Sequence, residues 1–374
     1  SLARLTDAID PAHETTLVDK VWLKNYPPEV PAEISMAPGD TVVTMLEKSF
    51  EDYPDRDAFA CMGKTLSYGD LDRQSAAFGA WLRQRAGLEP GARVAIMLPN
   101  ILQYPVALCG IFRAGLVAVN VNPLYTAREL RHQLSDSGAK CILILENFAH
   151  VLEGVISDTP VERVITTGIG DLLKFPKNVL TNVVLRHVKR AVPRYSIAGS
   201  VTFAAALRGG AGKSLKHVEL GFADIAFLQY TGGTTGVAKG AMLSHRNMTA
   251  NLAQMKAWLG QLDLQEPGTV ITALPLYHIF ALTVNLLSFL IRGGQNVLIT
   301  NPRDFPAFVA EMKKYPFTFI TGVNTLYNAL LNTPGFSEID FGNGNGLGLG
   351  TDKAREFDLA ANADRLPPRQ SRRL

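Results

Sequence analysis

The stretch IAFLQYTGGTTGVAKGAMLSHRNM (225–248) decides the fold of this 374-residue chain. It opens with the apolar run IAFLQ (225–229), which is typical of a buried strand in a parallel sheet. A loop with four glycines follows, and Ser244 stands where it can cap the first turn of a helix. The order of strand, glycine-rich loop and helix indicates an α/β domain with an anion-binding loop.

The loop Tyr230–Gly240 carries several groups that suit a triphosphate. Its glycines lack Cβ atoms, so backbone N–H groups can line a concave nest for anionic oxygens. Its three threonine hydroxyls can donate to phosphate or reach a metal, and Lys239 supplies a mobile positive charge. A plain flexible turn needs none of these groups, so we interpret the loop as a phosphate-binding site.

Strands and helices alternate along the chain before this loop. Apolar runs predict strands over 93–98, 116–122 and 140–145, and helical patterns predict helices over 68–85, 103–114 and 126–138. A second alternating block runs from about 223 to 341. This alternation predicts an α/β fold with two doubly wound subdomains.

We divide the chain into four parts. The tail is set apart because glycines alternate in GNGNGLGLG (342–350), which packs nothing and argues against a core strand. The parts are an irregular lead-in over 1–40, a first α/β subdomain over 41–200, a second with the phosphate loop over 201–341, and an atypical tail over 342–374.

Composition excludes several classes of protein. The chain has 37 Lys and Arg against 34 Asp and Glu, a net charge of +3 that does not favour a nucleic-acid binder. Its 47% hydrophobic content excludes an acidic disordered chain. Cys61, Cys109 and Cys141 have no zinc-ligand spacing, and their odd number argues against a disulfide scaffold. A reducing compartment, the cytoplasm, is therefore expected, and the first residues do not resemble a signal peptide.

Two segments bear on membrane contact. The uncharged run 267–291 contains Pro275, His278 and Asn285, so we interpret it as buried core rather than a spanning helix. The segment 174–194 carries six Lys and Arg, no acid, and valines near helical spacing. It is either a basic amphipathic surface for an anionic membrane or a solvated helix packed on the domain.

The chain resembles the adenylate-forming enzymes, and within them bacterial long-chain fatty-acid–CoA ligases of the FadD type. Such enzymes join ATP and a fatty acid to acyl-AMP with Mg²⁺, and CoA then displaces AMP to form the thioester. ATP, Mg²⁺, CoA and a long-chain fatty acid are thus implied. The resemblance covers about residues 20–341 and rests on KVWLKNYPPEVPAEI (20–34), the segments 97–140, 272–285 and 293–332, and the loop segment 228–248.

The resemblance also assigns roles to individual residues. A lone histidine in an apolar run such as PLYHIFAL is more often a core residue, but the resemblance places His278 near the carboxylate and α-phosphate, with Lys239 as a second catalytic residue. Thr231 is the implied metal contact. The implied phosphate contacts are Thr231, Gly232, Gly233, Thr234, Thr235, Gly236 and Lys239, and the implied acyl-site residues are Tyr277, Phe280, Gly322, Val323 and Leu326.

Part of the family pattern is not recognisable after residue 341. The adenine-contacting segment, the Tyr-Gly-x-Thr-Glu motif, the ribose-binding aspartate and the C-terminal lid domain with its lysine are not found. The sequence therefore predicts the N-terminal part of a ligase without the lid domain, with weak or no turnover. The alternative is a catalytically incomplete fragment that binds ATP and fatty acid. A homodimer and peripheral attachment to the inner face of the cytoplasmic membrane through 174–194 are further expectations, and no nucleic-acid partner is expected.

Overall fold

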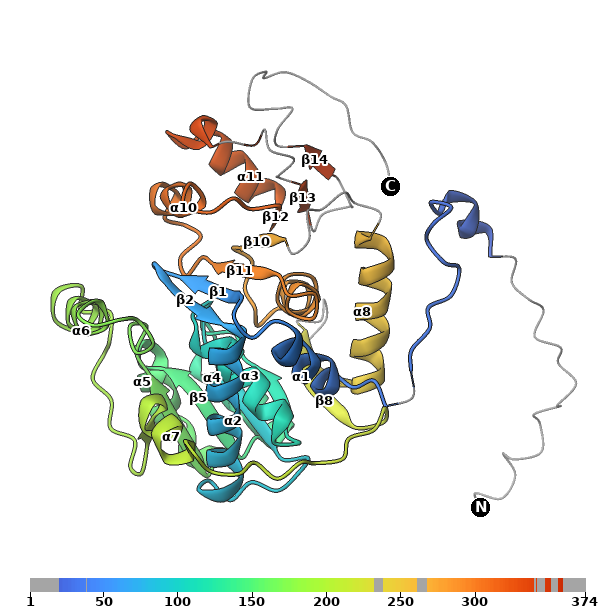
Figure 1. Cartoon of the computed structure of the whole chain (residues 1–374). Coiled ribbons are helices and arrows are strands. Elements are labelled where there is room, and N and C mark those ends of the chain that lie inside the picture. The colour runs from blue at the N-terminus through green and yellow to red at the C-terminus, as the bar shows by residue number, and fades with distance from the viewer. Residues whose placement is uncertain are drawn as a thin grey trace, which may run out of the picture.

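Two seven-stranded sheets form the centre of the molecule in a computed structural model of the chain (Figure 1). The structure describes residues 20–37, 39–231, 238–260, 268–339, 341, 347–350 and 356–358. It confirms the predicted α/β class, because helices cover both faces of parallel strands in each sheet.

The first sheet has the strand order β7-β6-β5-β3-β4-β8-β9. All neighbours pair in parallel except β8 and β9, which are antiparallel. The strands are β3 (Arg93–Met97), β4 (Val117–Asn120), β5 (Cys141–Leu145), β6 (Arg163–Thr167), β7 (Val201–Thr202), β8 (Ile225–Thr231) and β9 (Lys239–Ser244).

The second sheet has the order β14-β13-β12-β10-β11-β1-β2, with antiparallel strands only at its two edges. Its strands are β1 (Asp57–Cys61), β2 (Lys64–Ser67), β10 (Thr269–Thr272), β11 (Gln295–Leu298), β12 (Phe319–Gly322), β13 (Leu347–Gly350) and β14 (Glu356–Asp358).

Helices connect and cover these strands. The α-helices are α1 (Val42–Asp52), α2 (Tyr68–Gln84), α3 (Gln103–Arg113), α4 (Ala127–Ser137), α5 (Ala149–Glu153), α6 (Lys177–Val183), α7 (Phe203–Gly210), α8 (His245–Leu259), α9 (Ser288–Leu290), α10 (Phe305–Met312) and α11 (Asn324–Leu331). Two π-helices, η4 (Val184–Val188) and η5 (Ala281–Leu287), and four 3-10 helices, η1 (Val21–Asn25), η2 (Glu146–Phe148), η3 (Ile156–Asp158) and η6 (Phe336–Glu338), complete the described elements.

Strand β3 shows why the first sheet is buried on both faces. Val94 and Ile96 pack into the cluster formed with α2, α3 and α7, whereas Ala95 and Met97 pack into the cluster formed with α4 and α5. Side chains alternate between the faces of a strand, so a continuous apolar run is required where both faces are covered.

The helix starts follow from local sequence. Thr126 and Glu129 form a reciprocal capping box at α4, and Ser244 and Asn247 form one at α8. Each cap satisfies N–H groups that the first helical turn leaves unpaired. The predicted cap at Ser244 and the predicted helix over 126–138 are confirmed.

The two sheets exchange strands along the sequence. Strands β1 and β2 lie beside β11 in the second sheet, and β8 and β9 join the first sheet beside β4 (Figure 1). The predicted division at residue 200 therefore does not separate the sheets, and as a domain boundary it stays a prediction.

Part of the glycine-rich tail forms a strand, contrary to the expectation from the sequence. The segment 347–350 pairs in parallel with β12, and 356–358 pairs with 347–350 as the last strand of the sheet. Glycine weakens a strand but leaves its backbone hydrogen bonds intact, and the edge of β12 offers unpaired partners. The rest of 342–374 lies outside the described residues.

The uncharged run before residue 291 forms β10, a turn, η5 and α9, and residues 281–290 are all buried. This confirms its interpretation as core. Across the described residues, no helix combines the length and apolar character needed to cross a membrane.

Three buried thiols are expected to make the free energy of unfolding depend on pH. Burial raises the pKa of Cys61 to about 11 and the pKa values of Cys109 and Cys141 to about 12, from an ordinary value of 9.0. Above pH 9 the unfolded chain loses these protons before the folded chain does, so the free energy of unfolding falls as pH rises. The expected loss is about 1.4 kcal/mol per pH unit for each thiol between about pH 9 and pH 11.

Urea unfolding under reducing conditions, from pH 8 to pH 10.5, measures this slope. Cys141→Ala should reduce the slope by the contribution of one thiol. The other titrating groups contribute equally to the slope in both proteins. Equal slopes for the two proteins would contradict the prediction.

Candidate functional site

The predicted phosphate loop joins β8 to β9, two antiparallel neighbours at the edge of the first sheet. Thr231 ends β8 and Lys239 begins β9, and the two residues are direct cross-strand partners. Both are exposed, and directly paired side chains lie on the same face of a sheet. Lys239 has no ion pair within the described part of the chain, so its charge is available to an anion.

The remaining predicted phosphate contacts, Gly232, Gly233, Thr234, Thr235 and Gly236, lie outside the described residues. Gly240 is described, and the ring of Tyr230 occupies the space that a side chain at this position would need. A Cβ atom at Gly240 would lie 2.9 Å from ring atoms of Tyr230. The last glycine of the loop thus allows close approach of this ring.

Helix α4 holds both ends of the loop. The hydroxyl of Tyr230 donates to the carboxylate of Asp136, and Nε2 of His132 donates to the carbonyl oxygen of Ala238 at 3.1 Å. His132 and Asp136 are one helical turn apart, so they share a face. Burial, followed by the contact with Asp136, raises the pKa of Tyr230. His132 and Asp136 occur in HQLSD (132–136). Their i, i+4 spacing on a helix that follows a buried strand was the sequence signal from which this pair could have been found.

A buried polar network lies where the strands of the first sheet end. The amide of Asn120 donates to Oε1 of Gln229 at 3.0 Å, and Nε2 of Gln229 donates to the carbonyl oxygen of Tyr277 at 3.0 Å. The hydroxyl of Tyr104 lies 2.7 Å from Oδ1 of Asn120 and 2.9 Å from the carbonyl oxygen of Leu276. The network ties β4 and β8 to the segment that precedes His278.

Asn100 fixes the same segment from the end of β3. Its Nδ2 donates to the carbonyl oxygens of Thr272 and Leu274 at 3.0 and 2.9 Å, and its Oδ1 accepts from the N–H of Leu276 at 2.9 Å. The side chain is 3% exposed. A buried amide with this many partners defines the path of the backbone between the two sheets.

His278 is exposed just after the segment that this network holds. Its Nδ1 accepts from the N–H of Phe280 at 3.4 Å. A neutral ring bonded in this way carries its proton on Nε2, which has no hydrogen bond within the described residues. The ring can therefore donate to an anionic oxygen. Tyr277 is half-buried beside it, and burial raises the pKa of its hydroxyl.

The predicted acyl-site residues fall on two faces of the second sheet. Phe280 packs with the cluster that contains Val270 and Phe319, whereas Val323 and Leu326 pack with the cluster that contains Ile271 and Ile320. Gly322 ends β12, where an added Cβ would lie 3.0 Å from the ring of Tyr327. The structure thus brings Tyr277 to the end of β8 and places the other four around β12 and η5.

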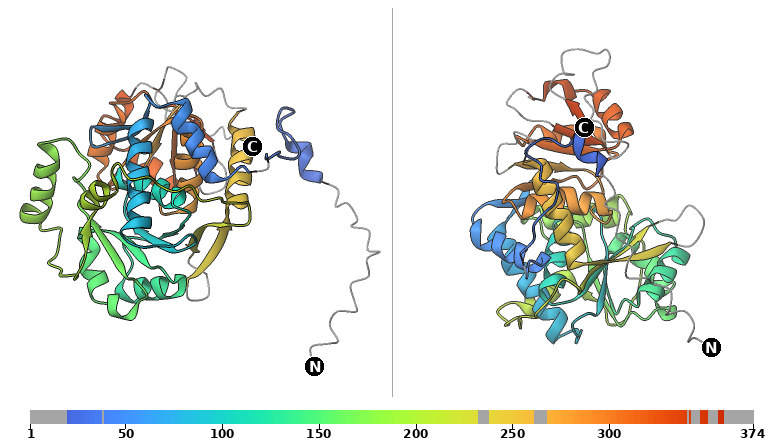
Figure 2. Two further views of the ribbon diagram at one scale, coloured as in Figure 1. Left: turned by 60° about the horizontal axis from the view of Figure 1, so that its bottom comes forward. Right: turned by 90° about the vertical axis from the view of Figure 1, so that its right-hand side faces the viewer.

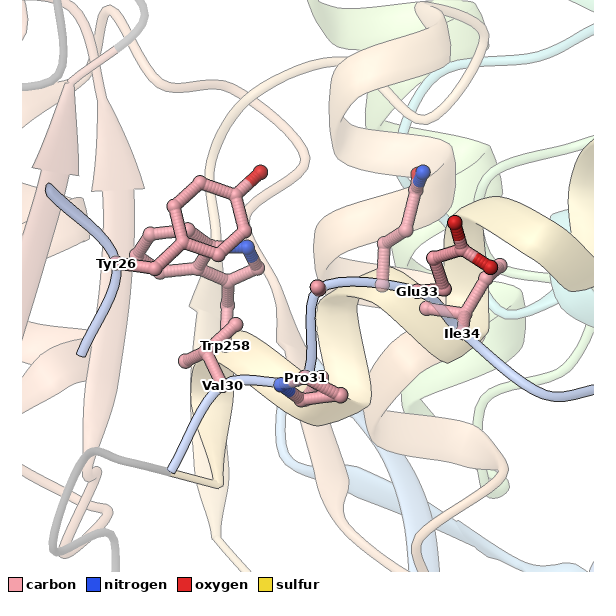
Figure 3. A pocket seen from close by; sticks show the side chains of 9 residues that line it. Tyr26, Val30, Pro31, Glu33, Ile34 and Trp258 are labelled. Atoms are coloured by element: carbon pink, nitrogen blue, oxygen red, sulfur yellow. The ribbon is translucent and has the colours of Figure 1, made fainter. Parts of the chain in front are cut away.

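A pocket of about 270 Å³ lies elsewhere, between the segment 26–34 and the end of α8. Tyr26 and Trp258 meet edge to face across it, with ring centroids 5.1 Å apart (Figure 3). None of the residues that the sequence assigns to the site lines this pocket.

Within the described residues, no group of three or more His, Cys, Asp or Glu side chains could hold a metal ion. Mg²⁺ usually binds proteins through one or two side chains, waters and the phosphates of a substrate. The exposed hydroxyl of Thr231 beside the loop fits such a metal, carried by a nucleotide.

Comparison with known proteins gives a family match over most of the chain. The sequence model of the family described as AMP-binding enzyme matches residues 46–354. The chain is 55% identical, over 322 residues, to the long-chain-fatty-acid–CoA ligase of Escherichia coli O157:H7. That alignment covers 86% of this chain and 57% of the relative, so the chain spans a little over half the length of the curated relatives it matches.

Solved structures share the fold. The anthranilate CoA ligase AuaEII in complex with anthranoyl-AMP superposes with a TM-score of 0.68 at 19% identity, covering 82% of this chain and 54% of that protein. A long-chain-fatty-acid-CoA ligase from Archaeoglobus fulgidus superposes with a TM-score of 0.65 at 21% identity. The superposition covers 80% of this chain and 55% of that protein. At these identities the likeness establishes the fold of the two sheets.

Proposed function

The chain belongs to the family of AMP-binding enzymes, and from this membership we propose that it is part of a long-chain fatty-acid–CoA ligase that binds ATP and the fatty acid. The observation that carries the proposal is that Thr231 and Lys239 are cross-strand neighbours at the two ends of the glycine-rich loop, where Lys239 forms no ion pair with any described residue. The 55% identity to a ligase named for this substrate class supports the choice of fatty acid.

In the proposed first half-reaction, a carboxylate oxygen of the fatty acid attacks the α-phosphorus of ATP. The bond from this phosphorus to the bridging oxygen breaks, so that acyl-AMP and pyrophosphate form. Lys239 and the loop hold the β- and γ-phosphates, and Nε2 of His278 donates to an oxygen near the reacting phosphorus. Fixed donors of this kind stabilise charge that develops in the transition state.

In the second half-reaction, the thiol of CoA attacks the acyl carbonyl carbon and AMP leaves. Mg²⁺, bound with the nucleotide and contacted by Thr231, would neutralise phosphate charge. Tyr277, Phe280, Gly322, Val323 and Leu326 would contact the acyl chain. Each methylene that such a site buries contributes about 0.8 kcal/mol, so preference among chain lengths would be graded.

ATP–pyrophosphate exchange with palmitate, on a sample whose intact mass has been verified, tests the first half-reaction. Exchange that requires palmitate would establish adenylation by this chain. The second candidate, the alternative from the sequence, is binding of ATP and fatty acid without turnover. Nucleotide binding by calorimetry without exchange would select it, and neither binding nor exchange would refute both.

The cellular setting is also a proposal. Buried free cysteines fit a reducing cytoplasm. A long-chain fatty acid partitions into lipid, so an enzyme that takes it up gains from peripheral attachment to the inner face of the cytoplasmic membrane. The homodimer expected from the sequence stays a prediction, and sedimentation velocity would measure it.

A further inference from the structure

The described surface exposes few large apolar side chains, and most of them gather in one short segment of the chain. Of the nine such residues that are exposed, five lie between 175 and 188. Scattered single residues need no explanation, but a contiguous apolar group on a surface marks a site of contact. The exposed fractions are 81% for Phe175, 52% for Val179, 61% for Leu180, 45% for Val183 and 72% for Val188.

These side chains form one stripe. Val179 and Val183 are four residues apart on α6, which places them on the same face with Leu180 beside them. The π-helix η4, whose hydrogen bonds run from residue i to i+5, continues α6 from Val184, so Val188 lies about one turn beyond Val183. The helix stands at the outer edge of the molecule, separate from the sheets (Figures 1 and 2).

Polar contacts attach the same helix to the domain. Oδ1 of Asn182 accepts from the N–H of Gly170 at 2.9 Å, and its Nδ2 donates to the carboxylate of Asp171 at 2.8 Å. Arg186 forms an ion pair with Glu146 at 2.6 Å, and Lys177 donates to the carbonyl oxygen of Met62. A helix packed for stability alone turns its apolar side to the core. Here polar contacts attach the helix, Val184 and Leu185 are only half-buried, and Val179, Leu180, Val183 and Val188 remain exposed.

Positive charge flanks the stripe in the sequence. Lys174, Lys189, Arg190 and Arg194 are exposed and form no ion pair within the described residues, and the segment 174–194 contains no acid. Two copies of the chain meeting at this stripe would bring like charges together. An anionic lipid surface complements both the charge and the apolar stripe.

We propose that the exposed face of residues 174–194, the apolar stripe of α6 and η4 with its four flanking cations, docks onto an anionic lipid bilayer. The side chains of Phe175, Leu180 and Val188 enter the boundary between head groups and acyl chains, while Asn182 and Arg186 keep the helix attached to the domain. The inference specifies the attachment proposed above, but it needs neither ATP binding nor ligase activity.

Co-sedimentation of the 374-residue chain with vesicles tests this docking. Vesicles of phosphatidylcholine with 30% phosphatidylglycerol should bind the protein at about 50 mM salt, and binding should weaken at about 500 mM as charges are screened. Neutral phosphatidylcholine vesicles should bind it much less. No binding to the anionic vesicles at low salt, or equal binding to both kinds, would overturn the proposal.

Matched variants distinguish binding through this surface from non-specific binding to vesicles. Leu180→Ser should weaken binding about tenfold, while Leu124→Ser, which changes a leucine of similar exposure elsewhere, should leave it unchanged. Lys174→Gln with Lys189→Gln should weaken it about fivefold per charge, and Lys216→Gln with Lys256→Gln should not. The side chains are exposed, so unchanged melting temperatures verify folding.

Equal losses from the two leucine variants would refute the assignment to this face. Self-association that Leu180→Ser abolishes, in a protein that binds no vesicles, would instead assign the stripe to a second copy of the chain. Because no arm of the experiment uses ATP or fatty acid, its failure would leave the proposed ligase function untouched.

Discussion

Replacing Asn100 with alanine is expected to lower the free energy of unfolding by about 2–4 kcal/mol. The substitution removes all three side-chain hydrogen bonds to the segment between Thr272 and Leu276. The carbonyl oxygen of Thr272 keeps a second partner, the N–H of Ile299, but the carbonyl oxygen of Leu274 and the N–H of Leu276 lose theirs. A buried polar group left without its partner costs about 1–3 kcal/mol. Two groups are left here, and Leu274 is only half-buried, so the expected loss stays in the lower part of the summed range.

Urea unfolding followed by circular dichroism measures this loss. Asn328→Ala is the matched control, because this asparagine is exposed on α11 and its substitution should change stability by less than about 0.5 kcal/mol. Asn100→Asp keeps the acceptor for Leu276 but places a carboxylate against two carbonyl oxygens, so it should destabilise as strongly. If Asn100→Ala unfolds at the same urea concentration as the control, the amide does not hold this segment.

Replacing Lys239 with alanine is expected to weaken ATP binding by about 10- to 100-fold without lowering stability. Hydrogen bonds to charged groups contribute about 1.5–3 kcal/mol, and each 1.4 kcal/mol corresponds to a factor of ten in affinity. The side chain is exposed and has no ion pair within the described residues, so the folded protein does not depend on it. Titration calorimetry with ATP and Mg²⁺ measures the change.

Lys216→Ala controls for the loss of one positive charge from an exposed position outside the loop. Its affinity for ATP should stay within a factor of two of the original protein. Lys239→Arg should recover part of the affinity, because it restores charge but not the compact ammonium group. Equal affinities of Lys239→Ala and Lys216→Ala would remove Lys239 from the phosphate site.

Local features of the fold were predictable because their causes are local. The caps at Thr126 and Ser244 depend on residues within one helical turn, and the buried strands are readable as apolar runs. Which strands become neighbours depends on residues far apart in sequence. No local pattern says that Phe59 pairs opposite Asn296, nor that the edge of β12 accepts a glycine-rich strand.

The candidate phosphate loop was readable as a continuous motif, and its role stays a prediction, whereas the polar network beside it was missed. The loop from Thr231 to Lys239 is one stretch of sequence. Asn100 and Gln229, in contrast, bond to backbone groups of residues 272–277, and Asn120 donates to Gln229. A signal was present, since each of these polar residues stands at or just beyond the end of an apolar strand. Their partners became visible only with the fold, because backbone carbonyls carry no signature in the sequence.

The exchange of strands between the sheets means that some strands are synthesised long before the strands with which they pair. The hairpin of β1 and β2 is synthesised about 230 residues before β11, the parallel neighbour of β1 among the described strands, has been translated. At about 5–20 residues per second the nascent hairpin waits roughly 10–50 s with one edge open. During that interval the growing chain presents a β-edge to other chains, and holdase chaperones that cover such edges would raise the yield of native protein.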